Sequence, residues 1–377
     1  MKNPKSSALF LRHAAALILA GASGFANANP PAPTYGITPF ALLPAVPGFY
    51  EGVAIHGNTV FASGPARFGT AGTGPSVIQV LDRKTGQLEQ TLSLSGEALA
   101  FEHAVSNIAT DCKGGVYALS TQLGMIHFAK QDGLYVQQAY GDPLPDLPTC
   151  GTPGVTGACA PTTPSFIDFP PIINDLAFDQ DGNAFVTDSL QATLFRYPAG
   201  GGAPEIWFQS PMLQGGGPLP FGTNGVRVDP KGKWVYFAVT TSVTNPALGT
   251  IYRLPLKPGN TDADLQVVHQ YEEGEAPDQL AFGKKGDLYV TLAFSNQISI
   301  LKTDGTEVRI SSQPGDAIPL DAPANLAFDK KSKSLLVVNH ALFSGNPDHF
   351  ALLRADVNDM GAALNEPCGE AEEGEGE

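Results

Sequence analysis

Short apolar runs separated by polar turns recur through most of the chain. The clearest unit, at 174–188, has a short polar residue, an apolar run, a Gly/Asp turn and a second apolar run. Related units begin at Glu51, Asn107, Asn224, Asp278 and Asn325. Two more apolar runs follow within a unit, as at 194–197 with 205–208 and at 251–256 with 265–271. Four strands in each of six units, at a spacing of about 50 residues, predict an all-β, six-bladed β-propeller.

The ends of the repeat region set the expected boundaries. We expect the propeller over 29–360, with the Pro/Gly-rich stretch 143–171 as an inserted loop and 361–377 as an acidic, disordered tail. The last unit lacks an outer strand after 356, and 35–43 can supply it, so that an N-terminal strand closes the ring. A β-sandwich is the structural alternative, but it does not explain the repeat.

The N-terminus has the composition of an export signal. Lys2, Lys5 and Arg12 precede the apolar stretch 14–22, and the small residues of 26–28 follow it. This pattern predicts a signal peptide over 1–28, cleaved after Ala28, and a periplasmic or secreted protein. A retained membrane anchor is the alternative reading. No later stretch of the sequence is apolar for long enough to span a membrane.

Composition narrows the class of partner. The chain has 42% hydrophobic residues, enough for a large core, and 42 Gly with 32 Pro, as a turn-rich β protein requires. Its net charge of −15 argues against nucleic acid or an anionic membrane surface as a partner. A small-molecule substrate is therefore the expected partner.

The predicted export makes the four cysteines candidates for disulfide bonds, because disulfides form in oxidising compartments. Cys150 and Cys159 bracket a Gly/Pro loop that a local disulfide would hold, and we predict that pair. Cys112 and Cys368 are candidates for a second bridge, which the sequence leaves open.

The starts of the six units are the main candidate site. The first strand of each propeller blade lines the central channel, so residues at equivalent positions form a ring at one mouth. All six of these side chains carry oxygen: Glu51, Asn107, Asn174, Asn224, Asp278 and Asn325. Carboxylate and amide oxygens are the ligands that Ca²⁺ prefers, so the ring predicts a divalent-metal site, with Ca²⁺ as the expected ion. The alternative is turn chemistry, since Asn and Asp favour turns before strands.

These starts also resemble a known family. The sequences NDL at 174, NGV at 224 and PDQL at 277 are similar to those of the gluconolactonase, regucalcin and luciferin-regenerating enzyme family. More distantly, they resemble the paraoxonases and diisopropylfluorophosphatase. The resemblance implies a metal held by Glu51, Asn224 and Asp278, with Asn174 serving the metal or the substrate. It further implies hydrolysis of an ester or lactone, with Asp278 as the base.

One departure from the family bears on the substrate. Sugar-lactone hydrolases of this family carry an Arg two residues before the Asn that matches Asn174, and this chain has Ile172 there. Apolar neighbours surround it: Phe166, Phe169, Pro170 and Pro171. We therefore expect a hydrophobic ester or lactone, with Ile172, Asn107, Asn174 and Asn325 as substrate contacts.

Histidine offers a rival base. His340 follows the second strand of the last unit and should return to the same mouth, and His103 can lie on the same face. Two other functions remain open for the scaffold. One is a non-catalytic propeller that binds a ligand or protein and carries a structural Ca²⁺; the other is a lyase or isomerase.

Overall fold

The computed structural model describes residues 35–161, 170–217, 220–243 and 248–368. All of these belong to one compact unit, Tyr35–Glu377. The predicted signal peptide, 1–28, and the rim residues Phe166 and Phe169 lie outside the described residues. Within the described part, no helix is long and apolar enough to cross a membrane.

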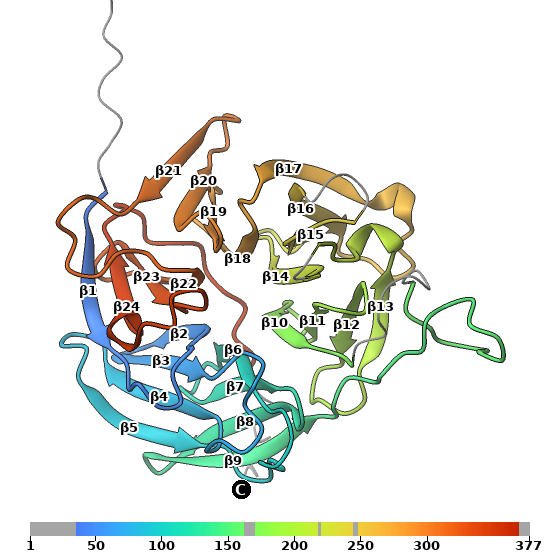
Figure 1. Cartoon of the computed structure of the whole chain (residues 1–377), viewed down its shortest axis with the longest axis horizontal. Coiled ribbons are helices and arrows are strands. Elements are labelled where there is room, and N and C mark those ends of the chain that lie inside the picture. Colours follow the sequence, from blue (N-terminus) through green and yellow to red (C-terminus); the bar gives the residue numbers. More distant parts are fainter. Residues whose placement is uncertain (1–34, 162–169, 218–219, 244–247, 369–377) are drawn as a thin grey trace, which may run out of the picture. The chain divides into compact units, whose positions relative to one another are not determined.

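Six four-stranded antiparallel sheets surround a central channel, which confirms the predicted six-bladed β-propeller (Figure 1). The innermost strands pack side by side in a closed ring. In chain order they are β2 Gly52–His56, β6 Val105–Thr110, β10 Ile173–Phe178, β14 Thr223–Val228, β18 Pro277–Phe282 and β22 Pro323–Asp329.

The outer strands continue each blade away from the channel. Blades 1 to 3 add β3 Thr59–Gly64, β4 Val77–Asp82, β5 Leu88–Ser93, β7 Val116–Ser120, β8 Gly124–Gln131, β9 Leu134–Gly141, β11 Ala184–Asp188, β12 Thr193–Tyr197 and β13 Glu205–Gln209. Blades 4 to 6 add β15 Trp234–Val239, β16 Leu248–Pro255, β17 Gln266–Glu273, β19 Leu288–Leu292, β20 Gln297–Leu301, β21 Glu307–Ser311, β23 Ser334–Asn339 and β24 Ala351–Ala355. Three short 3₁₀ turns complete the described regular structure: Pro211–Leu213, Asp262–Asp264 and Pro347–His349.

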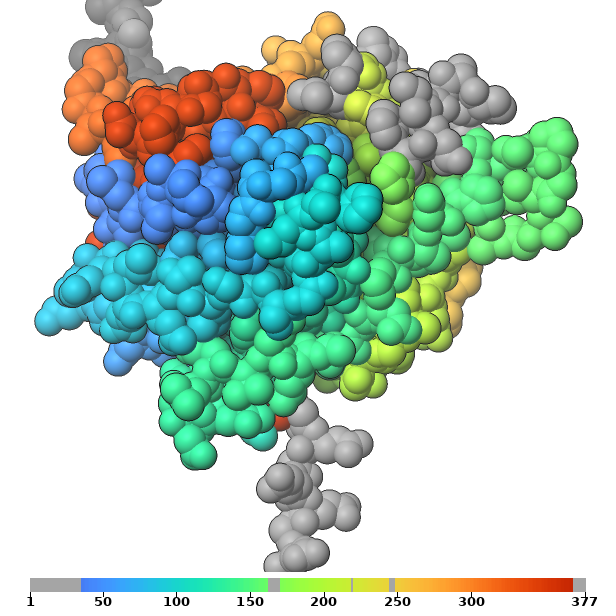
Figure 2. All heavy atoms as spheres, turned by 60° about the horizontal axis from the view of Figure 1, so that its bottom comes forward, coloured from blue at the N-terminus to red at the C-terminus, as the bar shows by residue number. Residues whose placement is uncertain are grey.

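The N-terminal strand closes the ring, as predicted. Strand β1, Ile37–Leu42, pairs with β24 and becomes the outermost strand of blade 6. Ile37 lies opposite Ala355 and Leu42 opposite Ala351. In Figure 2 the blue N-terminal segment lies against the red segment of the last blade. Both ends of the repeat region therefore stabilise one sheet.

The hydrophobic core is divided among the contacts between neighbouring blades. One buried cluster joins blades 6 and 1 through Val60, Leu81, Leu336 and Val338. Five more clusters join the other adjacent pairs of blades in the same way. Burial of apolar side chains on both faces of each sheet explains why the strands read as nearly continuous apolar runs.

The Gly/Asp turn of the clearest unit, at 179–183, is a hairpin turn. Asp179 Oδ1 accepts hydrogen bonds from the backbone N–H groups of Asp181 at 3.0 Å and Asn183 at 2.8 Å. Gly182 has a φ of 82°, the left-handed region that glycine tolerates. This carboxylate thus accepts hydrogen bonds within its own turn, as Asp side chains commonly do.

Both disulfides are present. Cys150 and Cys159 are bonded with a Cα–Cα distance of 4.9 Å, in the loop that leads from β9 to β10 and extends outward in Figure 1. Thr149 and Ala160 form a β-bridge beside it. Cys112 and Cys368, left open by the sequence, are also bonded, with a Cα–Cα distance of 5.2 Å.

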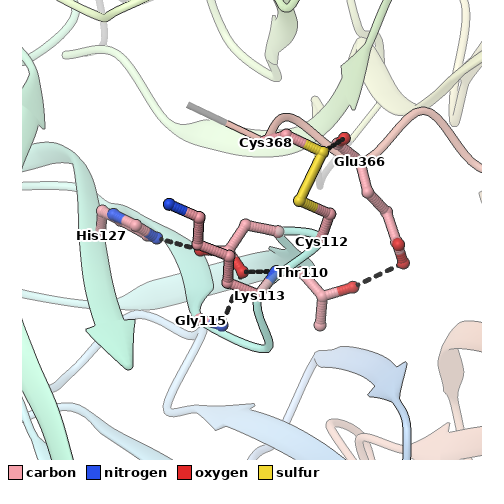
Figure 3. The surroundings of a disulfide bond; sticks show 8 residues. Thr110, Cys112, Lys113, Gly115, His127, Glu366 and Cys368 are labelled. Carbon is pink, nitrogen blue, oxygen red and sulfur yellow. Dashed lines mark hydrogen bonds and ion pairs between the residues drawn. A yellow bond between two sulfur atoms is a disulfide. The ribbon is translucent and has the colours of Figure 1, made fainter. Parts of the chain in front are cut away.

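The C-terminal segment differs from the expected acidic tail. Residues 361–368, which we name the C-terminal strap, run across the centre of the ring at the ends of the innermost strands (Figure 1). The Ala362 N–H donates to Phe282 O at 2.8 Å, and Asn365 Nδ2 donates to Phe178 O at 2.9 Å. Near the disulfide, Thr110 Oγ1 donates to Glu366 Oε1 at 3.1 Å (Figure 3). The strap therefore links blades 5, 3 and 2 at the far mouth of the channel.

Candidate active site at the channel mouth

Pairing within each blade sorts the channel residues into two layers. In blades 3, 4 and 5 the pairing of the first strand with the second shifts register and resumes at Leu176, Val226 and Leu280. These three residues therefore occupy equivalent positions in their blades. The residues two positions earlier form the outer layer, at the mouth opposite the strap. They are Glu51, Ser106, Asn174, Asn224, Asp278 and Ala324. The residues one position earlier form the inner layer: Gly52, Asn107, Asp175, Gly225, Gln279 and Asn325.

This layering corrects the expected ring of six. Glu51, Asn174, Asn224 and Asp278 share the outer layer, whereas Asn107 and Asn325 lie one residue deeper. Ile108 and Leu326 hold the place of Leu176, and each follows its Asn directly. The residues that stand in the outer layer of blades 2 and 6 are Ser106 and Ala324.

Asn107 and Asn325 serve a buried hydrogen-bond network. Asn325 Nδ2 donates to Asn107 Oδ1 at 2.8 Å, and Asn107 Nδ2 donates to Asp175 Oδ1. Asp175 Oδ2 also accepts from the Val226 N–H at 2.6 Å and from Arg227 Nη1 at 2.7 Å. These side chains join blades 6, 2, 3 and 4 across the channel. The structure therefore does not place Asn107 and Asn325 among the residues that line the mouth.

Glycine is required in the inner layer where a neighbouring strand comes close. A Cβ on Gly225 would lie 2.4 Å from Asp278 O and 2.7 Å from Gln279 Cα, both backbone atoms of blade 5. This close approach is the physical reason for the NG sequence at 224–225: it allows β14 to pack against β18. Asn224 and Asp278 are thereby brought to adjacent places in the ring.

Five of the six outer-layer residues, all except Ala324, form the floor of a cavity of about 680 Å³. Most of its other lining residues are apolar, from loops between and within blades: Phe49, Phe68, Ala104, Pro170, Pro171, Ile172, Phe221, Ala293, Phe294, Ala322, Leu342 and Phe343. Ile172 lies in this wall, as do the described rim residues Pro170 and Pro171. A few polar groups in an apolar concavity of this size are typical of a small-molecule site.

Asn224 is held so that its oxygen faces no protein donor. Thr240 Oγ1 donates its proton to Pro277 O at 2.9 Å, and so it accepts from Asn224 Nδ2 at 2.9 Å. This fixes the orientation of the amide. Asn224 Oδ1 and Asp278 Oδ1 are then both buried without a hydrogen-bond partner in the described part of the chain. Buried oxygens without partners are costly, so these two atoms are ready for a ligand.

Burial and neighbouring negative charges raise the pKa of both carboxylates at the floor. Burial raises the pKa of Glu51 to about 8, and the negative charge of Asp175 adds to the effect. Burial raises the pKa of Asp278 well above its usual range, helped by the charges of Glu51 and Asp175. A divalent cation would lower the pKa of both groups, because it favours the charged form of each carboxylate.

A metal fits this donor set. Two carboxylates and two amides, Glu51, Asp278, Asn174 and Asn224, offer the hard oxygen ligands that Ca²⁺ takes. Asn174 Oδ1 already accepts from Gln279 Nε2 at 3.2 Å, but a carbonyl oxygen has a second lone pair. Within the described ranges, no group of three or more His, Cys, Asp or Glu side chains is placed to hold a metal. A site here must therefore use the Asn oxygens.

Both candidate histidines line the same cavity. His340 follows β23, and burial lowers its pKa to about 4, so it is neutral at pH 7. Its Nε2 is buried and has no hydrogen-bond partner among the described residues. His103 differs, because Nδ1 lies 3.0 Å from Phe101 O and Nε2 lies 2.9 Å from Gly74 O. His103 is thus engaged in holding loops, whereas His340 Nε2 has no such partner among the described residues.

Sequence reasoning missed part of the wall. Phe49 stands two residues before Glu51, the same spacing as Ile172 before Asn174, and this signal was available in the repeat. Arg67 and Phe221 come from loops, and Arg67 lies between β3 and β4, where no repeat position marks it. Loop residues reach a site through the path of the chain, which the strand pattern does not encode.

Comparison with known proteins gives likenesses in structure alone. No protein-family model and no curated protein sequence matches this chain. Among solved structures, 642 chains match. A calcium-binding regucalcin from Agrobacterium tumefaciens is 15% identical with a TM-score of 0.55, covering 89% of this chain and 95% of its own.

Two other solved structures have similar scores. A virginiamycin B lyase from Staphylococcus aureus, solved as an inactive variant with quinupristin, is 12% identical with a TM-score of 0.52, covering 85% of this chain and 99% of its own. A protein named as a candidate gluconolactonase is 13% identical with a TM-score of 0.53, covering 87% and 94%. At these identities the likeness concerns the fold. The chain adopts the six-bladed β-propeller fold of the regucalcin and gluconolactonase structures.

Proposed function

We propose that this protein is an exported, metal-dependent hydrolase of a hydrophobic ester or lactone. The observation that carries the proposal is the floor of the mouth cavity, where Asn224 Oδ1 and Asp278 Oδ1 are buried beside Glu51 without a hydrogen-bond partner in the part of the chain that the structure describes. Such a cluster is unfavourable unless a cation occupies it. The regucalcin-type and gluconolactonase-type neighbours support a calcium-binding lactonase on this fold.

Each floor residue has a role in this proposal. Glu51, Asn174 and Asn224 hold a divalent cation, most simply Ca²⁺, together with Asp278. When bound, the cation supplies Lewis-acid polarisation of the substrate carbonyl. Asp278, which lines the cavity and whose Oδ1 accepts no hydrogen bond from the described residues, takes the proton from the attacking water. The apolar walls bind the substrate and exclude bulk water.

The substrate class follows from the wall. Ile172, Phe49 and Phe221 present hydrocarbon to the cavity. Burial of apolar surface contributes about 25 cal/mol per Å², so a hydrophobic acyl or alcohol part gains most here. Export would place the enzyme in the periplasm or outside the cell. The signal-like N-terminus and the two disulfides support that location.

The test is a screen of aryl esters and hydrophobic lactones with added Ca²⁺ or with chelator. We expect turnover that chelator abolishes and Ca²⁺ restores. Asp278→Asn should lower kcat at least about 100-fold, in line with the loss of a general base, while the melting temperature with chelator stays near that of the wild type. Full activity of Asp278→Asn, or turnover indifferent to chelator, would contradict the proposal.

Elimination is a second candidate, because His340 lines the same cavity with Nε2 unpartnered among the described residues, and one structural neighbour is a lyase. Mass spectrometry separates the two reactions. Hydrolysis adds the elements of water to the products, whereas a lyase leaves an unsaturated product of unchanged total mass. A chelator-sensitive melting temperature without any turnover would instead favour a non-catalytic binding propeller.

A further inference from the structure

We propose that Arg67 makes this cavity selective for ligands that combine an apolar body with a carboxylate. The proposal deepens the proposed function by adding a charged group to the hydrophobic substrate. It is argued from the guanidinium group itself, from the loop that carries it and from what surrounds it.

Arg67 has few partners among the residues that the structure describes. Its Nη1 donates one bond, at 3.3 Å, to the carbonyl of its neighbour Phe68. Its Nε is buried without a partner, and no carboxylate in the described part of the chain lies within ion-pair distance of the guanidinium. Guanidinium has five N–H donors, so most of its donors are available in a partly buried, largely apolar cavity. An unpaired charge in such surroundings is unfavourable, and an incoming anion would correct this.

The loop that carries Arg67 is fixed by a second set of contacts. Glu102 Oε2 accepts from the N–H groups of Gly69 at 2.8 Å and Thr70 at 3.0 Å, and from Thr70 Oγ1 at 3.1 Å. His103 holds Gly74 O in the same loop. Glu102 is a carboxylate of the same wall, and its oxygens accept hydrogen bonds from this loop rather than from Arg67. The guanidinium is positioned without being neutralised.

Aromatic stacking sets the direction of the guanidinium. Its Cζ lies 4.2 Å from the centre of the Phe49 ring, and Phe49 packs edge-on against His340 at 5.9 Å. Stacking on a ring face leaves the edge of the planar guanidinium open. That edge is the fork that binds a carboxylate with two parallel hydrogen bonds. The same wall continues into Phe68 and Phe221, whose rings stack 6.4 Å apart, as a surface for the apolar body.

The charge balance of the mouth also admits an anion. The floor carries the two carboxylates Glu51 and Asp278, which a divalent cation would neutralise. The remaining charged side chains of the wall, Arg67 and Glu102, balance each other. Glu102 is already bound by the N–H groups of its own loop, so Arg67 is the charge with donors to spare among the described residues. A free carboxylate on the substrate would therefore be attracted to the wall at Arg67 and not only to the cation.

The experiment compares two isosteric probes, 6-phenylhexanoate and 6-phenylhexanamide, by calorimetry with Ca²⁺ and again with chelator. We expect the carboxylate to bind at least about tenfold more tightly than the amide in both buffers, since charge-assisted bonds to Arg are strong. Arg67→Gln should remove this preference and Arg67→Lys should keep part of it. Arg253→Gln is the matched control: Arg253 also stacks on an aromatic ring, Trp234 at 4.3 Å, but does not line the cavity.

Three results overturn the proposal. One is equal affinity of the two probes for the wild type, or no saturable binding of either. Another is a carboxylate preference that survives in Arg67→Gln. The third is a preference that vanishes with chelator, which would assign the anion to the cation. The two proposals can fail separately. Chelator-sensitive turnover of neutral esters by the wild type tests the hydrolase, whereas the ratio of the two probe affinities tests Arg67.

Discussion

The protonation of Glu51 makes the stability of the metal-free protein depend on pH, and a bound cation should remove this dependence. Its pKa of about 8 means that the metal-free folded protein keeps a proton that the unfolded chain, with a pKa of 4.5, releases. Between these two values the unfolded state binds fewer protons, so the free energy of unfolding falls as pH rises. A bound cation removes the need for that proton. Stability without metal should therefore decline from pH 5 to pH 9, and stability with Ca²⁺ should not.

Glu51→Gln tests this at the level of one side chain. With chelator at pH 9, the variant should be more stable than the wild type by roughly 2–4 kcal/mol, because a neutral amide replaces a buried charge. With Ca²⁺ the order should reverse, since the variant loses a ligand. Urea unfolding at pH 5, 7 and 9 measures both effects. Glu89→Gln, on an exposed position of β5, is the control and should change neither; a Glu51 variant that behaves like this control would rule out the cluster as a cation site.

His340 should make the free energy of unfolding fall towards acid pH, the opposite of the effect of Glu51. Its folded pKa of about 4 lies below the unfolded value of 6.5, because burial disfavours the imidazolium. The unfolded chain takes up the proton first, so stability is lost as pH falls from 6.5 to 4. His340→Gln should flatten this acid limb by up to about 3 kcal/mol. His56→Gln, for which burial is only partial, should leave it unchanged.

The same His340→Gln variant also tests the assignment of the base. If Asp278 is the base, ester hydrolysis by this variant should stay within about tenfold of the wild type at pH 8, far above that of Asp278→Asn. A loss equal to that of Asp278→Asn would transfer the role of base to His340.

At the scale of the strand, the repeat pattern predicted the strands correctly, but two residues were expected in the wrong layer of the channel. The expected runs 194–197 and 205–208 correspond to β12 Thr193–Tyr197 and β13 Glu205–Gln209. Asn107 and Asn325 were aligned by residue type, but their distance to the next apolar residue differs from that of Asn174. A one-residue offset moves a side chain to another layer, and the spacing carried that information. Arg67 had no such signal, because its place depends on how a loop folds over the mouth.

The composition of the C-terminal segment did not predict the strap. Glutamates dominate the sequence after 365, and they predicted disorder, yet Cys368 fixes the segment to blade 2. The sequence separation of 256 residues in this disulfide closes most of the chain into a loop. Removing such a cross-link raises the entropy of the unfolded chain, which lowers stability by about 2–4 kcal/mol.

Replacing both cysteines of the strap, Cys112→Ser with Cys368→Ser, should therefore lower the melting temperature and leave ester hydrolysis intact. Activity should persist because the strap lies at the opposite mouth from Glu51 and Asp278. Cys150→Ser with Cys159→Ser is the control: its separation of 9 residues predicts a smaller loss of stability. Hydrolysis that falls in parallel with strap removal would show that the two mouths are coupled.

The whole molecule depends on closure, because its core consists of contacts between blades. Ile37 of β1 is buried in the cluster that joins blades 5 and 6, and Ala41 in the cluster that joins blades 6 and 1. A strand from the N-terminal side of the fold thus supports two of the six contacts. Since every blade packs on two neighbours, opening one contact weakens those on either side, and the ring should unfold in a single transition.

Ile37→Asp tests closure against a matched exposed site, Thr38→Asp, in the same strand. The first places an unpaired charge in a buried apolar cluster and should cost about 3 kcal/mol or more; the second faces solvent and should stay within about 0.5 kcal/mol. Because Glu51 and Asp278 belong to blades 1 and 5, which flank blade 6, loosening that blade should also weaken Ca²⁺ binding in Ile37→Asp. Calorimetric unfolding with and without Ca²⁺ measures both quantities. Two separate transitions in the wild type, or equal effects of the two variants, would show that β1 does not stabilise the closed ring.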